Sequence, residues 1–142
     1  MIPTLLVTLQ FAALALLLLL PPWPALTPLV LLTGALGAAL GSWTLLFNRL
    51  GNFNIRPQPR AGGKLITGGP YRYIRHPMYS ALLLMFAGIA WGDGPGYKLG
   101  IWAVLAVVLV LKARLEEKGL LRLFPGYAEY RRTSKRFIPF IW

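Results

Sequence analysis

Long apolar runs, separated by clusters of proline and glycine, constrain the fold of this chain most strongly. The first run, residues 4–20, has seventeen residues without a charge, and the second, residues 25–47, can span a membrane with some tilt. Shorter runs follow at residues 78–91 and 99–111. Because proline cannot continue a helix, residues 21–24 predict a tight turn between the first two. The pattern predicts an all-α membrane bundle of about four transmembrane helices in a single domain.

The composition excludes several classes of function. Hydrophobic residues make up 56% of the chain and charged residues 13%, which is typical of an integral membrane protein. The absence of cysteine excludes disulfides and thiolate sites, and a single histidine excludes a multi-histidine metal site within one chain, so no metal is expected. No G-x-G-x-x-G sequence occurs, so a dinucleotide-binding fold is not indicated.

All of the positive charges except Lys98 lie in two segments that flank apolar runs. Six of the fifteen cations lie between Arg49 and Arg75, and eight lie between Lys112 and Arg136, in a chain of net charge +11. Under the positive-inside rule this places the loop at residues 48–76, and both termini of a four-span protein, in the cytoplasm. The expected partners are membrane lipids rather than nucleic acid.

Polar segments follow the second and fourth runs. Glycine and proline in residues 48–76 forbid a long helix, and Pro77 suits the first turn of the next one. That next run, residues 78–91, is only about 21 Å long as a helix, short of a ~30 Å hydrocarbon core. Residues 113–124 are helix-prone and charged, which predicts a cytosolic C-terminal helix followed by a tail.

Small residues repeat along the second apolar run. Gly34, Gly37 and Gly41 fall at spacings of three and four, which places them on one helical face. Such faces allow a neighbouring helix to approach closely. We therefore expect this face to contact another helix of the bundle.

Acidic residues are few, and two of them stand just beyond the fourth run. Lys112 and Glu116 are four residues apart and share a helical face. One interpretation is a solvated ion pair of little energetic weight. The other is a carboxylate, from Glu116 or its neighbour Glu117, that accepts hydrogen bonds from a ligand's amine or hydroxyl groups.

The single histidine stands at the predicted start of the third helix. There His76 and Arg75 can act as a helix cap or contact a lipid headgroup. They can also reinforce the anion site that the free N–H groups of a first turn provide. Tyr79, three residues on, should point to the same side of the helix, whereas Tyr73 suits an interfacial aromatic belt.

Two separated blocks carry a family resemblance. TGGPYRYIRHPMYSA and EEKGLLRLFPGYAEYRRTSKRFIPFIW resemble the isoprenylcysteine carboxyl methyltransferase and phospholipid methyltransferase superfamily, over roughly residues 53–142. The resemblance implies S-adenosylmethionine bound without a Rossmann fold, in a half formed by residues 48–142, with residues 1–47 adding two transmembrane helices. It implies methyl transfer to a lipophilic or amphiphilic acceptor, such as an isoprenylcysteine-like carboxylate, a lipid or a small thiol.

The resemblance also implies a set of site residues. The expected catalytic positions of the family correspond to His76, Tyr79 and Glu116. Lys112 corresponds approximately to an arginine that contacts substrate in the eukaryotic enzymes. Gln58 is a weaker match to a cofactor contact. The implied cofactor-binding residues are Lys64, Leu65, Ile66, Tyr71, His76, Pro77, Met78, Tyr79, Glu116 and Glu117.

Two other functions compete with methyl transfer. Membrane sterol-type reductases carry a similar R-H-P-x-Y block and use NADPH, but they are longer and have more spans. A non-catalytic lipid-binding membrane protein would need no cofactor at all. The compact chain suggests a multi-pass protein of a bacterial inner membrane, and its sequence leaves the methyl acceptor and the oligomeric state open.

Overall fold

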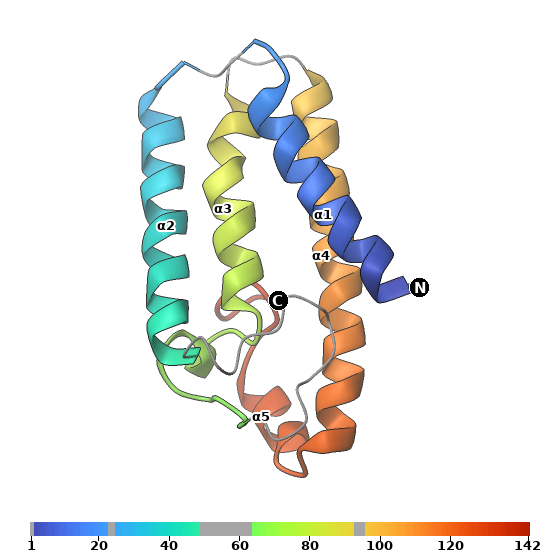
Figure 1. Ribbon diagram of the computed structural model, residues 1–142. Coiled ribbons are helices and arrows are strands. Elements are labelled where there is room, and N and C mark those ends of the chain that lie inside the picture. The colour runs from blue at the N-terminus through green and yellow to red at the C-terminus, as the bar shows by residue number, and fades with distance from the viewer. Residues whose placement is uncertain (1, 23–24, 49–63, 93–95) are drawn as a thin grey trace.

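The computed structural model describes residues 2–22, 25–48, 64–92 and 96–142, and within them the chain is helical (Figure 1). One isolated parallel bridge, between Ile74 and Lys135, is the β-type pairing seen in these ranges. The predicted all-α class is therefore confirmed. The elements are α1 (Ile2–Leu19), α2 (Pro28–Asn48), η2 (Gly69–Arg72), α3 (Pro77–Trp91), α4 (Gly96–Leu123) and α5 (Tyr127–Thr133).

The four long helices lie side by side and give the molecule two different ends (Figure 1). At the turn end, α1 and α3 finish and α2 and α4 begin. Here Lys98 is 1% exposed and its Nζ donates to the carbonyl oxygen of Pro22 over 2.8 Å, while the Tyr97 hydroxyl donates to that of Pro21. At the opposite end, which we call the polar end, lie η2, α5 and the tail formed by residues 134–142.

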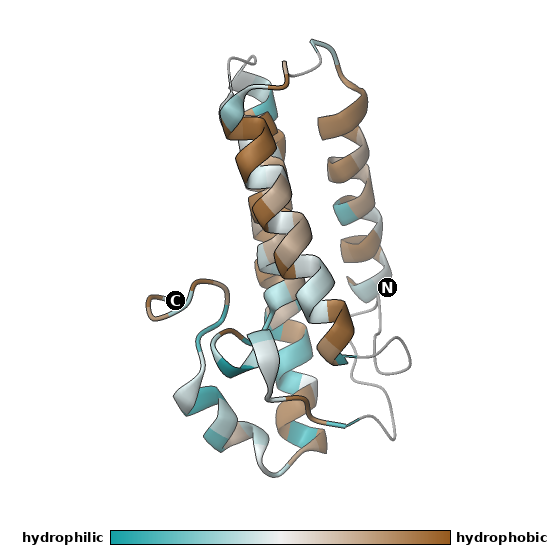
Figure 2. Ribbon diagram, turned by 90° about the vertical axis from the view of Figure 1, so that its left-hand side faces the viewer, coloured by the Kyte–Doolittle hydropathy of each residue, from teal (hydrophilic) through white to brown (hydrophobic). Residues whose placement is uncertain are grey.

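Two helices are long and apolar enough to cross a membrane. The 18-residue windows in α1 and α2 have mean hydropathies of 2.3 and 1.8, yet only 22% and 11% of them is buried within the protein. So much exposed apolar surface suits contact with lipid rather than water. Figure 2 shows this apolar character along the bundle and the hydrophilic residues gathered at the polar end. The third run forms α3, an apolar helix of 15 residues, short as predicted.

The fourth apolar run and the charged segment after it form one helix. We expected residues 99–111 and 113–124 to be separate elements, but α4 continues for 28 residues through Lys112. Alanine, leucine, glutamate, lysine and arginine dominate the second half of α4, and these are strong helix formers. The continuous helix therefore carries Glu116 and Glu117 rigidly from the apolar bundle into the polar end.

Close contact between α2 and α3 depends on glycines from both helices. A Cβ added at Gly37 would lie 2.6 Å from the backbone nitrogen of Met85, and one at Gly88 would lie 2.4 Å from Oγ1 of Thr33. The backbone N–H of Gly88 also donates to that hydroxyl over 3.1 Å. The prediction for Gly34 was wrong, because no atom of the described residues lies within 4 Å of a Cβ placed there, and Gly41 makes only an ordinary contact with Ala81.

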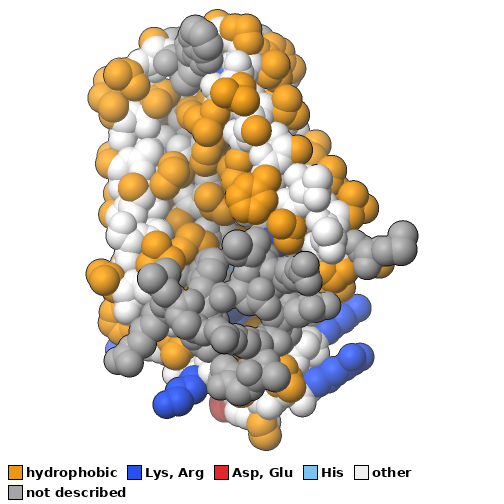
Figure 3. Space-filling view, viewed as in Figure 1, with side chains coloured by type: hydrophobic (Ala, Val, Ile, Leu, Met, Phe, Trp, Pro, Cys, Tyr) orange, Lys and Arg blue, Asp and Glu red, His pale blue; other side chains and the backbone are white. Residues whose placement is uncertain are grey.

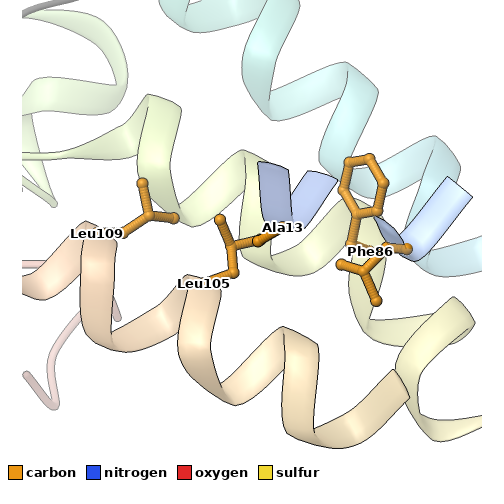
Figure 4. Close-up of a cluster of buried hydrophobic side chains, with 5 residues drawn as sticks. Ala13, Phe86, Leu105 and Leu109 are labelled. Atoms are coloured by element: carbon orange, nitrogen blue, oxygen red, sulfur yellow. The ribbon is translucent and has the colours of Figure 1, made fainter. Parts of the chain in front are cut away.

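A small hydrophobic core forms where α1, α3 and α4 meet (Figure 4). Trp102 ties α4 to α3, since its indole N–H donates to the carbonyl oxygen of Leu83 over 2.9 Å. This packing sets the start of α3 beside the second half of α4, where the candidate site lies. The core cluster consists of Ala13, Leu17, Phe86, Leu105 and Leu109.

Candidate active site

His76 caps the N-terminus of α3 and is almost fully buried, with 5% of its surface exposed. Its carbonyl oxygen accepts hydrogen bonds from the backbone N–H groups of Tyr79 and Ser80. Both ring nitrogens face carboxylates of α4. Nδ1 lies 3.5 Å from Oε2 of Glu116, and Nε2 lies 3.3 Å from Oε1 of Glu117. The structure thus brings together the histidine and the paired acids that the sequence singled out.

Glu117 is the buried centre of a charged network and is 3% exposed. The Arg75 Nε donates to its Oε1 over 3.0 Å, and the Arg136 Nη2 donates to its Oε2 over 2.8 Å. Burial raises the pKa of Glu117, but its bonds to His76, Arg136 and Arg75 outweigh burial and hold that pKa well below its usual range. Both oxygens of this carboxylate are therefore engaged within the protein.

The tail reaches the site by pairing with the segment ahead of α3. Backbone N–H groups of Arg75 and His76 donate to the carbonyl oxygens of Lys135 and Arg136 over 2.7 and 3.1 Å. The Ser80 hydroxyl donates to the carbonyl oxygen of Phe137 over 2.7 Å. These hydrogen bonds hold the tail against the start of α3, so that Arg136 can bind Glu117. The sequence predicted a tail but not this contribution, because no periodic pattern encodes the path of an irregular segment.

Glu116 has a different setting from Glu117. Its side chain is 29% exposed, and it accepts a hydrogen bond of 3.2 Å from the hydroxyl of Tyr79. The rings of His76 and Tyr79 stack with centroids 5.5 Å apart and planes inclined by 4°. Glu116 therefore stands at the edge of the network, with its orientation fixed and part of its surface open.

The surrounding carboxylates determine the charge of the histidine. Burial lowers the pKa of His76, but hydrogen bonds to Glu116 and Glu117 outweigh it, so the pKa is raised above its ordinary value of 6.5. The protonated ring can donate from both nitrogens at once, which matches its two carboxylate neighbours.

Three tyrosines add phenol groups around the carboxylates. Burial, and next the charge of Glu116, raise the pKa of Tyr71, so this phenol stays neutral. Tyr130 donates its hydroxyl to the carbonyl oxygen of Tyr71 over 2.7 Å. Tyr127 is 1% exposed, and its hydroxyl has no hydrogen-bond partner among the residues that the structure describes. Tyr127 and Tyr130 were not among the predicted site residues; the one signal for them was their position in the second of the two sequence blocks.

Lys112 lies deeper, one turn before Glu116 on α4. It is 1% exposed, its ammonium donates to the side-chain oxygen of Gln10 on α1, and its Nζ lies 5.3 Å from the centre of the Tyr79 ring. The alternative of a solvated Lys112–Glu116 ion pair is therefore wrong, because the ammonium is buried. Gln10 was also missed, although it is the only amide in the first apolar run.

The remaining predicted cofactor residues fall on two segments. Pro77 is buried and Met78 half-buried in the first turn of α3, directly beside His76. Lys64 is exposed, and Leu65 and Ile66 are half-buried in the coil that leads to η2, so their place in the site stays a prediction. Gln58 lies outside the described residues. Within the described ranges, no group of three or more His, Cys, Asp or Glu side chains could hold a metal ion.

Comparison with known families identifies the family of this chain. Residues 29–126 match the family described as phospholipid methyltransferase, which is more than half of the chain. The chain belongs to the phospholipid methyltransferase family. The match confirms the resemblance inferred from the two sequence blocks. It includes His76, Tyr79 and both carboxylates of α4, whereas the tail that supplies Arg136 lies beyond it.

Two curated relatives of this family member are bacterial resistance proteins. The cobalt-zinc-cadmium resistance protein CzcN of Cupriavidus metallidurans is 32% identical over 80% of this chain and 50% of its own length. The nickel-cobalt-cadmium resistance protein NccN of Alcaligenes xylosoxydans xylosoxydans is 32% identical over 56% of this chain and 38% of its own length. The chain thus spans about half the length, or less, of these relatives.

Proposed function

We propose that the protein is a membrane methyltransferase that uses S-adenosylmethionine and methylates a lipophilic or amphiphilic acceptor. The observation that carries the proposal is the arrangement at the polar end. A partly open carboxylate, Glu116, is held by a buried histidine and a tyrosine at the end of an apolar bundle, in a member of the phospholipid methyltransferase family.

The residues present fit the chemical groups of this cofactor. S-adenosylmethionine carries a cationic amine and a sulfonium, and when bound it supplies an electrophilic methyl group. Glu116 offers a carboxylate with 29% of its side chain exposed, suited to the cationic part. Tyr127 offers a buried hydroxyl that lacks a partner among the described residues, a donor that a ligand or a water can satisfy.

Each residue then has a distinct task. Glu116 accepts hydrogen bonds from the cofactor's amine, and Tyr79 and His76 hold Glu116 in place while lining the same site. Glu117 is a positioning residue, since its oxygens bind Arg75, Arg136 and His76. A carboxylate or thiolate acceptor needs no general base, so binding both reactants in line and excluding water would supply most of the acceleration.

The acceptor is proposed to enter from the lipid side. Lys112 is buried among α1, α3 and α4, where its ammonium can meet an anionic group of an acceptor whose apolar part stays in the bilayer. With its cations concentrated in residues 49–75 and 112–136, which the positive-inside rule assigns to the cytoplasmic side, the protein would be multi-pass in a bacterial inner membrane with both termini cytoplasmic. The acceptor class of carboxylate, lipid or thiol is a matter for experiment.

Relatives named for metal resistance suggest a setting for this reaction. With one histidine and no cysteine, the sequence offers few of the ligands that divalent transition metals prefer. We therefore place any contribution to metal resistance in the methylated product rather than in metal held by this chain.

Labelled methyl transfer tests the proposal. The purified protein is incubated in detergent with isotopically labelled S-adenosylmethionine and bacterial lipid extract, and the products are analysed by mass spectrometry. We expect label in a lipophilic product, and loss of that label in Glu116→Gln but not in Glu129→Gln. Binding of NADPH without S-adenosylhomocysteine would instead indicate a reductase, and binding of neither would indicate a non-catalytic protein.

A further inference from the structure

A basic pocket lies on the tail, and both arginines that bind Glu117 help to line it. Its volume is about 280 Å³, and Ser134, Ile141 and Trp142 form part of its lining. The other lining residues are all cations, and none of the lining residues is acidic. These cations are Arg75, Arg131, Arg132, Lys135 and Arg136.

Hydrogen bonds from two largely buried side chains hold the floor of this basic pocket in place. Arg75 has 8% of its side chain exposed, and besides Glu117 it donates to the carbonyl oxygens of Arg131, over 3.1 Å, and of Ser134. Ser134 is 3% exposed and donates its hydroxyl to the carbonyl oxygen of Tyr130 over 2.6 Å. The bonds fix the backbone from which the outer cations project.

The outer cations keep the pocket electropositive. Arg131, Arg132 and Lys135 are exposed. Arg132 lies 3.6 Å from Glu129, but both side chains are more than 70% exposed, so this pair contributes little. Guanidinium groups bind phosphate oxygens in pairs, so the pocket suits a phosphate-sized anion.

An exposed apolar turn adjoins the cations. Ile138, Phe140, Ile141 and Trp142 are 48%, 82%, 75% and 48% exposed. The turn is ordered, because backbone N–H groups of Phe137 and Ile138 donate to the carbonyl oxygen of Trp142. Figure 2 shows this apolar end of the tail projecting from the side of the bundle, and Figure 3 shows lysine and arginine side chains at the polar end below the apolar surface.

We propose that the basic pocket binds the phosphate of an anionic membrane phospholipid, with the apolar turn seated among the acyl chains beside it. A soluble phosphate would use the cations alone and leave the turn in water, whereas a membrane lipid uses both features. This goes beyond the proposed function, since the bound lipid is neither the methyl donor nor the acceptor. It anchors the tail whose Arg136 completes the network around Glu117.

Titration of the full chain in a neutral detergent tests this binding. The probes are short-chain phosphatidylglycerol, short-chain phosphatidylcholine and inorganic phosphate. The variant Arg131→Ala/Arg132→Ala/Lys135→Ala removes the outer cations. Its control, Arg114→Ala/Lys118→Ala/Arg122→Ala, removes the same charge from exposed positions on α4. A second variant, Phe140→Ser/Ile141→Ser, changes only the apolar turn.

We expect phosphatidylglycerol to bind the wild type about tenfold or more tightly than either other probe, and the pocket variant to lose about tenfold or more of that affinity. The matched control should stay within about twofold of the wild type, since its cations lie outside the pocket. The turn variant should lower the affinity for phosphatidylglycerol and leave the affinity for inorganic phosphate unchanged. An equal loss in the control, equal binding of inorganic phosphate, or no preference for phosphatidylglycerol would overturn the proposal. None of these results depends on methyl transfer.

Discussion

The apolar half of the bundle and its polar end are held together by different forces. Between α2 and α3, Gly37 and Gly88 allow the backbones to approach closely, and the volume of the side chain at these positions is what matters most. At the polar end, Glu117 of α4 joins two arginines and a histidine from two other segments, and charge matters. The α2–α3 contact therefore determines how closely the helices pack, whereas the network around Glu117 determines which segments meet at the site.

The largest expected effect is loss of the buried carboxylate. Glu117→Ala removes the carboxylate that binds Arg75 and Arg136 and leaves His76 with Glu116 alone, and breaking a buried ion pair in this way costs ~3–5 kcal/mol. Thermal unfolding in mild detergent measures it. Glu129→Ala, whose side chain is 72% exposed, serves as the control and should be nearly neutral. Equal stability of both variants would mean that the charges do not hold this end together.

The next effect concerns the apolar half. Gly88→Ala forces a methyl group against Thr33 and Val30, and such overpacking costs ~1–3 kcal/mol. Gly34→Ala is the matched control, because no described residue has an atom within 4 Å of the added Cβ and alanine favours the helix by ~1 kcal/mol. The same unfolding measurement compares them. If the two variants were equally stable, close packing of α2 on α3 would be refuted.

A smaller effect separates the orientation of Glu116 from the fold. Tyr79→Phe removes the hydroxyl that donates to Glu116, and should weaken binding of S-adenosylhomocysteine by ~0.5–1.5 kcal/mol with little change in unfolding. Tyr73→Phe, at an exposed tyrosine, should change neither quantity. Calorimetric titration of both variants provides the test, and an unchanged affinity for Tyr79→Phe would count against the proposed task of its hydroxyl.

The smallest effect is a dependence of stability on pH. The pKa of Glu117 is lowered, so its contribution is present above pH 4.5 and is lost as the pH falls through the lowered value. The pKa of His76 is raised, so its contribution is present below pH 6.5 and is lost as the pH rises through the raised value. Unfolding midpoints should therefore be highest between these values, and His76→Gln should remove the alkaline decline. A decline that persists in this variant would have another origin.

Much of this arrangement could be predicted from the sequence because it depends on helix periodicity and helix ends. Pro77 marks the start of α3, and the apolar run before Lys112 places Glu116 and Glu117 just beyond the apolar part of a helix. Because α3 and α4 are antiparallel and pack together, the start of α3 and the second half of α4 lie at the same end of the bundle. The contacts of His76 with both carboxylates follow from that placement.

Other features depend on tertiary contacts that the sequence does not encode locally. Gly34 and Gly37 share a spacing pattern, yet only the packing of α3 decides that Gly37 is covered and Gly34 is not. Arg136 reaches Glu117 because an irregular tail pairs with residues ahead of α3. The sequence alone does not distinguish Glu116 from Glu117, because both are glutamates. The proposed preference for Glu116 as the ligand-binding carboxylate depends on the positions of Arg75 and Arg136, which bind Glu117.

The central claim is that the partly open carboxylate of Glu116, and not the enclosed one of Glu117, receives a charged nucleoside. Calorimetric titration of S-adenosylhomocysteine into the wild type, Glu116→Gln and Glu129→Gln tests it most directly. We predict tight binding by the wild type and by Glu129→Gln, and a loss of about tenfold or more in a folded Glu116→Gln protein. Equal affinity in all three proteins would contradict the account.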